Sequence, residues 1–219
     1  MRLADDDAPG AAPALALTLD ACGGDTDHAL LAALVRLQMP ATVFVTRRWI
    51  DRNPAALATL LARPDLFELQ NHGAAHVPAL IGQRLYGMQG PADLAGVERE
   101  ILGGAQAITR VSGQQPRWYR GAGARYDAQS LQLIERLQLR LAGYSLNADD
   151  GATASAEAVS QRLRRAVAGD IVLAHLNHPG AGTGPGLARA LPDLQQRGFR
   201  FVRLSQVAGT RPLTQAPAR

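Results

Sequence analysis

Short apolar runs alternate with longer segments of helical periodicity along most of this chain of 219 residues. The apolar runs predict strands near residues 15–19, 41–45, 66–70, 117–119, 139–145, 171–174 and 200–204. The intervening patterns predict helices over residues 27–38, 54–62, 91–111, 127–138, 155–168 and 186–197. Such an alternation is typical of an α/β fold with a parallel sheet, either open or closed into a barrel.

A single domain is expected, because no repeat, low-complexity run or long linker divides the chain. We predict that the domain spans residues 14–208. Residues 1–13 are then a flexible N-terminal segment and residues 209–219 a C-terminal tail. The apolar content of 47% fits a globular protein with a well-buried core.

The sequence predicts no membrane span, because no apolar run reaches the roughly 20 residues that a bilayer requires. The first residues carry no hydrophobic signal core. A cytoplasmic location is therefore expected, or a periplasmic or secreted one if a leader has been removed. The single cysteine cannot form an internal disulfide, and the oligomeric state stays open.

All 23 basic residues are arginines, since the chain contains no lysine. This excludes Walker-type phosphate loops, pyridoxal Schiff bases and Ser-Lys dyads, which all require a lysine. The net charge of +4 would permit an acidic partner. The arginines are scattered among carboxylates, however, and do not cluster with aromatic residues, so no nucleic-acid partner is expected.

Conspicuous polar residues stand where the predicted strands end. They are Asp20, His72, Arg120, the adjacent pair Asp149 and Asp150, and His175. In a parallel barrel or a doubly wound sheet, the carboxyl ends of the strands form one face, where active sites are built from separate loops. The sequence therefore predicts that these residues converge on one site.

His72 and His76 lie four residues apart, directly after the third expected strand, in the sequence N-H-G-A-A-H. On one helical turn, side chains at positions i and i+4 point the same way, which lets two imidazoles share one metal ion. The alternative is a pair of solvated residues at a loop edge. No glutamate stands between them, which disfavours a metalloprotease of the H-E-x-x-H type.

The other candidates each have a catalytic and a structural interpretation. Asp20 can act as a general base beside a metal-bound water, or can simply stabilise its loop. Cys22 can be a soft metal ligand or a nucleophile, although a lone cysteine beside glycines is more often just buried. His175 ends a stiff strand and can donate a proton, whereas His178 is expected to be solvated or structural. Arg120 can pair with Asp20 or make a surface ion pair of little consequence.

In this order, the segments resemble the polysaccharide deacetylase family, carbohydrate esterase family four with the NodB homology domain. The family motifs are T-F-D-D-G, H-x-x-x-H, R-P-P-Y, D-x-x-D-W and L-x-H. Here they read T-L-D-A-C from Thr18, H-G-A-A-H from His72, R-G-A-G from Arg120, N-A-D-D-G from Asn147 and L-A-H from Leu173. The resemblance covers nearly the whole chain, from about residue 15 to residue 207.

The resemblance implies a distorted parallel (β/α) barrel of about seven strands and a metal-dependent hydrolase, usually with Zn²⁺ as its cofactor. Members remove acetyl groups from N-acetylated sugars, so the implied partner is an acetylated carbohydrate substrate. The implied roles are the catalytic base for Asp20, the general acid for His175, and orientation of the base for Arg120. Asp150, and not its neighbour, is expected to tune the acid. The implied metal ligands are His72, His76 and Asp20.

The departures from the family pattern are also informative. The second aspartate of the first motif, a metal ligand in the family, is Ala21 here, in a D-A-C-G-G variant. Asp20, Asp25, Cys22 or water would have to complete the metal site. Asn147 replaces an aspartate of the fourth motif and a glycine replaces its tryptophan, while the third motif lacks its prolines and ring.

Two rival functions follow from these departures. One is a deformylase or amide hydrolase acting on a small substrate, because the glycine-rich segment over residues 82–91 could cap a compact pocket. The other is a non-catalytic carbohydrate-binding domain that has lost its metal.

Overall fold

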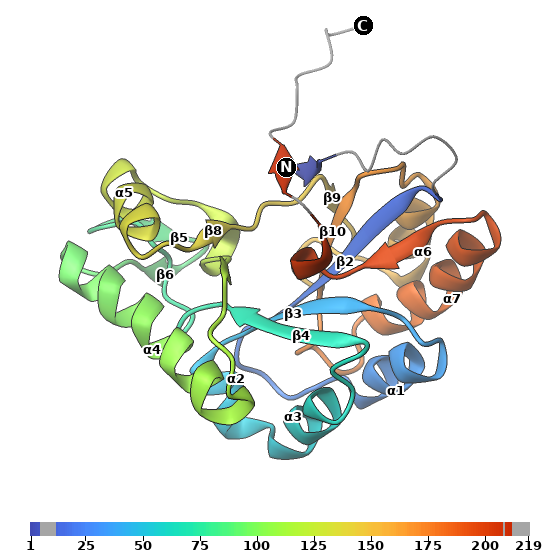
Figure 1. Cartoon of the computed structure of the whole chain (residues 1–219), viewed down its shortest axis with the longest axis horizontal. Helices are drawn as coiled ribbons and strands as arrows, with labels where there is room; N and C mark the ends of the chain where they lie inside the picture. The colour runs from blue at the N-terminus through green and yellow to red at the C-terminus, as the bar shows by residue number, and fades with distance from the viewer. Residues whose placement is uncertain (5–11, 208, 212–219) are drawn as a thin grey trace, which may run out of the picture.

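The computed structural model of the chain describes residues 1–4, 12–207 and 209–211. Its main sheet consists of parallel strands that curl into a half-barrel, with helices packed along the outside (Figure 1). The strands are β2 (Ala14–Ala21), β3 (Ala41–Val45), β4 (Phe67–Asn71), β7 (Trp118–Tyr119), β8 (Arg140–Leu141), β9 (Leu146–Asn147), β10 (Ile171–His175) and β11 (Arg200–Val202). The expected distorted parallel barrel of about seven strands is confirmed.

The strand order is β8-β7-β4-β3-β2-β10-β9, and β11 pairs with the first residues of β2. The longest strand, β2, thus lies centrally between β3 and β10. The register pairs Asp20 with His175 of β10 and with Phe44 of β3. The parallel arrangement therefore brings the carboxyl ends of β2 and β10 side by side, as the sequence predicted.

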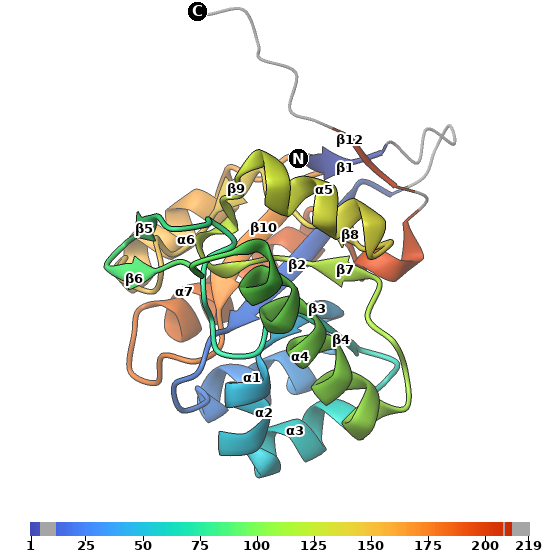
Figure 2. The ribbon, with the colours of Figure 1, turned by 90° about the vertical axis from the view of Figure 1, so that its left-hand side faces the viewer.

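The seven α-helices of the described chain flank this sheet (Figures 1 and 2). They are α1 (His28–Arg36), α2 (Arg47–Arg52), α3 (Pro54–Leu61), α4 (Leu94–Ser112), α5 (Ala128–Arg136), α6 (Ala156–Arg164) and α7 (Thr183–Gln196). Asp27, Asp127 and Ser155 cap α1, α5 and α6 by accepting an N–H from three residues further on. None of the helices in the described part of the chain is long and apolar enough to cross a membrane.

The two faces of β2 meet different surroundings because side chains alternate along a strand. Leu15, Leu17, Leu19 and Ala21 are fully buried in the main apolar cluster, which packs under the helices. Asp20 points to the opposite side, where Arg120 lies. One face of β2 therefore packs in the apolar core, and the opposite face carries the polar side chain of Asp20.

Two elements differ from the sequence prediction. The strand expected over residues 139–145 is only the two-residue β8, because beyond it the carbonyl groups of Ala142 and Gly143 accept hydrogen bonds from the Arg120 side chain; β9 begins after the predicted range. Helix α2 was not predicted. It begins after Thr46, whose side chain accepts the N–H of Trp49.

The segments near the two ends of the chain form strands that the sequence did not predict. Arg2–Leu3 form β1, which pairs antiparallel with β12 (Thr210–Arg211), so the two ends of the described chain lie together (Figure 2). Leu3 is buried, and the side chain of Arg2 forms an ion pair with Asp170. Residues 2–3 and 210–211 thus form a strand pair that the sequence did not predict, while residues 5–11, 208 and 212–219 lie outside the described part and the domain bounds stay a prediction.

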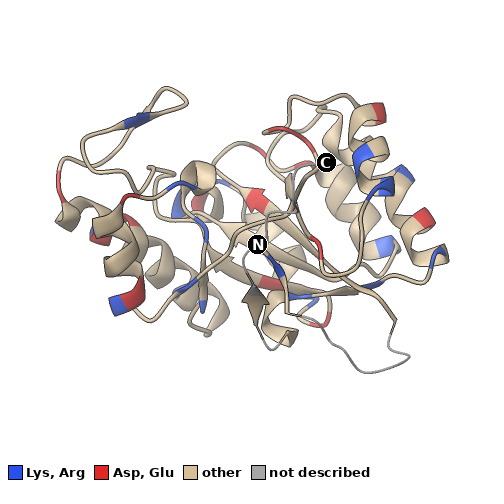
Figure 3. Ribbon diagram, turned by 90° about the horizontal axis from the view of Figure 1, so that it is seen from above, with Lys and Arg blue, Asp and Glu red and all other residues tan. Residues whose placement is uncertain are grey.

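Charged residues of both signs are interspersed along the surface helices (Figure 3). On α6 and α7, for example, Arg164 lies 3.5 Å from Asp193, and Arg189 lies 3.9 Å from Glu157. The arginines of these helices are thus balanced locally by carboxylates.

Candidate active site

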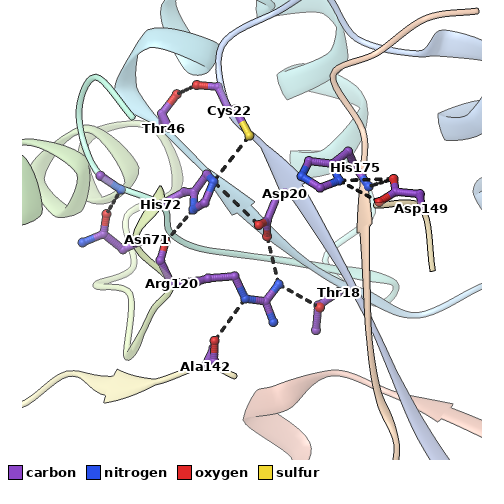
Figure 4. Close-up of polar contacts among 12 residues, drawn as sticks. Thr18, Asp20, Cys22, Thr46, Asn71, His72, Arg120, Ala142, Asp149 and His175 are labelled. Atoms are coloured by element: carbon purple, nitrogen blue, oxygen red, sulfur yellow. Dashed lines mark hydrogen bonds and ion pairs between the residues drawn. The ribbon is translucent and has the colours of Figure 1, made fainter. Parts of the chain in front are cut away.

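A pocket of about 830 Å³ opens at the carboxyl ends of β2 and β10. Four of the residues that line it are Asp20, Cys22, His76 and His175, which come from three separate segments of the chain. The expected convergence of strand-end residues is confirmed (Figure 4).

The Arg120 guanidinium is fully buried and is held from several sides. Its Nε donates to the carbonyl of Ala142 at 3.0 Å, and its Nη2 donates to the carbonyl of Gly143 at 3.1 Å. Its Nη1 lies 2.9 Å from both the Thr18 hydroxyl and Oδ1 of Asp20. The predicted pairing with Asp20 is therefore present as a buried, charge-assisted hydrogen bond, and not as a surface ion pair.

Asp20 is held in its ionised form by its neighbours. Burial raises the pKa of this carboxyl, but the positive charge of the neighbouring Arg120, above all, lowers it below its usual value. Arg120 occupies Oδ1, while Oδ2 lies 3.7 Å from Nε2 of His72. One carboxylate oxygen is thus anchored and the other faces the histidine cluster.

His72 is oriented by a main-chain group. Its Nδ1 donates a hydrogen bond to the carbonyl of Arg120, which leaves Nε2 with its lone pair directed towards Cys22 and Asp20. A partner of this kind on the far nitrogen is typical of metal-binding histidines, because it selects the tautomer and fixes the ring. Burial lowers the pKa of His72, so the imidazole is neutral.

His76 reaches the same place from the loop that follows β4. Its ring centroid lies 4.9 Å from that of His72, and burial lowers its pKa to about 3. The loop is anchored by Glu100 of α4, whose carboxylate accepts the N–H groups of Ala75 and Val77. This support holds His76 in a left-handed backbone conformation, with φ of 64°.

Cys22 completes a compact set of donor atoms. The sulfur of Cys22 and one ring nitrogen each of His72 and His76 all lie within 4.8 Å of one another. Thiolate and neutral imidazole are the donors that zinc prefers, so this set fits a divalent transition metal. Burial and the charges of Asp20 and Asp149 raise the pKa of the Cys22 thiol well above its ordinary value, which disfavours a nucleophilic role for the free thiol.

Asp25, another candidate for the missing donor, lies elsewhere. Its carboxylate is exposed and forms an ion pair with Arg52 of α2, 2.6 Å away. It is therefore a surface residue and not a member of the cluster.

His175 is paired with Asp149 and not with Asp150. Its Nδ1 lies 2.9 Å from Oδ1 of Asp149, whose Oδ2 accepts the main-chain N–H of His175 and the hydroxyl of Thr183. Burial lowers the pKa of His175, but the hydrogen bond to Asp149 and the charge of Asp20 raise it above its ordinary value.

The expected role of Asp150 beside this histidine is thus wrong. The Asn147 side chain accepts the N–H of Asp150, which adopts a left-handed conformation with φ of 49°. This turn directs the Asp150 carboxylate outward to Arg162 of α6, at 2.6 Å.

A small hairpin forms one rim of the pocket. Its strands β5 (Arg84–Leu85) and β6 (Met88–Gln89) are joined through Tyr86 and a glycine, both with positive φ. Tyr86 is 76% exposed and lines the pocket together with Met88. The hairpin rests on Gly123, where an added Cβ would lie 2.5 Å from the Leu85 side chain. Tyr144 contributes another aromatic ring to the pocket wall.

The comparisons with known proteins agree with this geometry. A family model described as polysaccharide deacetylase matches residues 7–142 of the chain. The chain belongs to the polysaccharide deacetylase family. Among proteins with curated descriptions, none matches it.

Several solved structures share the fold of this family member. The peptidoglycan N-acetylglucosamine deacetylase Bc1960 aligns with a TM-score of 0.75 and 21% identity, over 90% of this chain and 88% of that chain. A family 4 carbohydrate esterase from Streptomyces lividans, in complex with acetate, aligns with a TM-score of 0.71 and 24% identity, over 86% and 92%. BA3943 of Bacillus anthracis, a CE4 family pseudoenzyme, aligns with a TM-score of 0.71 and 18% identity, over 91% and 66%.

Sequence reasoning predicted most of the residues that the structure brings together in this pocket but missed two of their supports. Glu100 lies on α4, and nothing in the sequence around it indicates that its carboxylate anchors the loop that carries His76. Thr183 begins α7 and fixes Asp149, which the sequence also did not indicate. Cys22, which the sequence favoured as a simply buried residue, joins the two histidines in the donor cluster, and its D-x-C spacing from Asp20 was a usable signal.

Proposed function

We propose that this chain is a metal-dependent hydrolase that removes acetyl groups from N-acetylated sugars of a cell-wall polymer or exopolysaccharide. The carrying observation is that two buried acid-base pairs, Asp20 with Arg120 and His175 with Asp149, flank one histidine cluster in a single pocket. Membership of the deacetylase family supports the same reaction class.

His72 and His76 would hold the ion, with Zn²⁺ as the first candidate, because both imidazoles are neutral and their nitrogens converge. When bound, a divalent cation supplies a Lewis acid that polarises an acetamide carbonyl and acidifies water. The remaining steps belong to side chains of this protein.

Asp20 is the proposed general base. The charge of Arg120 keeps the carboxylate ionised despite its burial, so it can accept the proton of the attacking water. Arg120 also holds Oδ1 in place, which leaves Oδ2 on the side of the histidine cluster to take that proton. The water oxygen forms the new bond to the acetyl carbon, and a backbone N–H helps to stabilise the oxyanion.

His175 is the proposed general acid. Because Asp149 accepts from Nδ1, the Nε2 proton of the imidazolium is the one available for transfer. As the C–N bond breaks, this proton passes to the departing amine, and the products are acetate and a free amino sugar. General acid-base groups of this kind contribute about two to four orders of magnitude in rate.

The pocket walls suit a sugar. Tyr86 and Tyr144 offer ring surfaces, while Asn147 and Asp150 offer polar groups along the opening. The apolar faces of a pyranose can pack on such rings while its hydroxyl groups meet the polar side chains. The neighbour from Streptomyces lividans and Bc1960 support a carbohydrate substrate, since both are described as acting on this class.

Two other functions are favoured by particular observations. The hairpin bearing Tyr86 lines the pocket beside Gly123 and narrows its rim, which suits a hydrolase of a small amide or formamide. Ala21 stands in place of a family metal ligand, and one structural neighbour is a pseudoenzyme, which suits a non-catalytic carbohydrate-binding domain.

One experiment separates the three. The chain is reconstituted with Zn²⁺ and incubated with acetylated chitin oligomers, peptidoglycan fragments, monomeric N-acetylglucosamine and small formamides, and released acetate or formate is measured. Acetate from the sugars that disappears in His175→Ala, with the metal still bound, supports the proposal. Turnover of small amides alone supports the second function, and binding of sugars without turnover supports the third.

A further inference from the structure

We propose that the thiolate of Cys22 is the third protein ligand of the metal, in place of the carboxylate that Ala21 cannot supply. This inference rests on the proposed metal-dependent function and names the ligand set of the same site. It also takes the role of ligand away from Asp20, which then serves as the base alone.

The alternation of β2 places the thiol where a ligand is needed. Leu19 and Ala21 point into the apolar cluster beneath the helices. Asp20 and Cys22 are two residues apart and lie on the other side, facing the pocket. The thiol at position 22 therefore faces the same pocket as the Asp20 carboxylate and can contribute to a metal site there.

The sulfur lies beside the histidine that is best prepared for binding. Cys22 Sγ is 3.5 Å from Nε2 of His72, the nitrogen left free by the hydrogen bond to the Arg120 carbonyl. The main chain of Cys22 is anchored by the Thr46 hydroxyl, which donates to its carbonyl oxygen at 2.7 Å. The backbone that carries the thiol is thus fixed, and the sulfur lies within reach of the His72 ring.

Asp20 is less suited to the same role. Its Oδ1 is committed to Arg120, and its Oδ2 lies 3.7 Å from Nε2 of His72. The compact donor set within 4.8 Å contains the sulfur and the two imidazoles. Assigning the third position to Cys22 leaves Oδ2 of Asp20 available to accept a proton.

The chemistry of the ligand set has a consequence for metal choice. A thiolate carries the same single negative charge as the carboxylate that it replaces, but it is a much softer donor. Sites with cysteine and histidine favour Zn²⁺, whereas carboxylate and water favour Mn²⁺ or Mg²⁺. We therefore expect this site to select Zn²⁺ and Co²⁺ over Mn²⁺ more strongly than a site with aspartate and two histidines.

Cobalt spectroscopy tests the assignment directly. The purified full chain is stripped of metal and titrated with Co²⁺, and a thiolate-to-cobalt charge-transfer band is sought in the near ultraviolet. The wild type and the control His28→Ala, an exposed histidine on α1, should both show the band. Cys22→Ala should lose it. It should also bind Co²⁺ more weakly, by at least the roughly 10- to 100-fold that partners outside the ligand shell contribute.

A second measurement requires no variant. Cys22 is the only cysteine of the chain, so alkylation by iodoacetamide adds one mass increment that reports on this residue alone. Under conditions in which the folded apo-protein reacts, one equivalent of Zn²⁺ should slow alkylation at least tenfold, whereas Mg²⁺ should not.

The outcomes distinguish this inference from the proposed function. If Co²⁺ binds without the charge-transfer band and Zn²⁺ leaves alkylation unchanged, Cys22 is not a ligand, and the metal-dependent function stands. If neither the wild type nor His28→Ala binds Co²⁺ or Zn²⁺, both proposals are overturned. Band and protection together establish the thiolate ligand.

Discussion

The imidazole Nδ1 of His175 lies 2.9 Å from Oδ1 of Asp149, and the same carboxylate accepts the main-chain N–H of His175 and the hydroxyl of Thr183. The carboxylate is fully buried and held from three directions, so it can fix both the position and the protonation state of the ring. By contrast, Asp150 forms an exposed ion pair with Arg162. This difference between adjacent aspartates supplies a matched pair of variants.

Asp149→Asn should move the alkaline limb of the pH profile to lower pH. His175 must be protonated to act as the acid, and its raised pKa preserves that form until the pH rises through it. Removing the negative charge lowers this pKa, so activity is lost earlier as pH rises. The profile of deacetylation rate against pH measures the shift. Asp150→Asn should leave the limb where it is, and equal shifts in both variants would contradict the assignment.

Arg120→Gln should reduce both stability and activity. It leaves the Asp20 carboxylate buried without its main cationic partner, which costs about 3 kcal/mol or more for pairs of this kind. In the wild type Arg120 lowers the pKa of Asp20, so this pKa should rise in the variant. As the pH falls, the Asp20 carboxylate of the variant should therefore become protonated at a higher pH than in the wild type, and the stability and the base that depend on its charge are lost there. Urea unfolding at several pH values measures the effect.

The control for Arg120→Gln is Arg162→Gln, which breaks an exposed ion pair with Asp150. A change of no more than about 1 kcal/mol is expected for this surface pair. Comparable losses in the two variants would show that Arg120 does not stabilise the buried carboxylate.

His76→Ala should abolish near-stoichiometric binding of Zn²⁺ at neutral pH, because one of two converging imidazoles is removed. Elemental analysis after dialysis measures the bound metal, and His28→Ala provides the control with an exposed histidine. Full metal content in His76→Ala would place the ion elsewhere.

Tyr86→Ala should weaken substrate binding without unfolding the protein. The ring is 76% exposed at the hairpin tip, so stability should change by no more than about 0.5 kcal/mol. Loss of a stacking surface should raise KM for acetylated oligosaccharides roughly tenfold, since an aromatic contact contributes about 0.5–1.5 kcal/mol beyond its buried area. The value of kcat should stay close to that of the wild type.

Steady-state kinetics with oligomeric and monomeric substrates measure this effect. Leu131→Ala, which removes another exposed apolar side chain on α5, controls for general surface changes. An unchanged KM in Tyr86→Ala would remove the hairpin from the substrate site.

The convergence of Asp20, His72 and His175 could be predicted from the sequence because it depends only on strand order and direction. Parallel strands end at one edge, and each of these residues stands at or directly after a strand end. Alternation of apolar and helical patterns was sufficient to locate those ends to within a residue or two.

The partner of His175 could not be predicted in the same way. Asp149 and Asp150 are adjacent and chemically identical, and the choice between them depends on a turn that the Asn147 side chain stabilises. Residue 150 adopts a left-handed conformation in this turn, which sends its carboxylate outward. Such a choice is made by local backbone geometry and leaves no pattern in the composition.

The early end of the fifth predicted strand, which is reduced to β8, has a similar origin. The segment over residues 139–145 is apolar enough to form one strand, but the buried guanidinium of Arg120 takes the carbonyl groups at its centre. A contact across the fold thus overrode a local preference.

The short length of the outermost strands also affects the two margins of the half-barrel. β8 and β9, at the two ends of the main strand order, are each only two residues long, and Arg140 places a charge on one of them. Margins this short offer little template for an incoming strand of another molecule. At the β8 margin, the same guanidinium that anchors the carboxylate in the pocket thereby helps to protect an incompletely closed barrel against edge-to-edge aggregation.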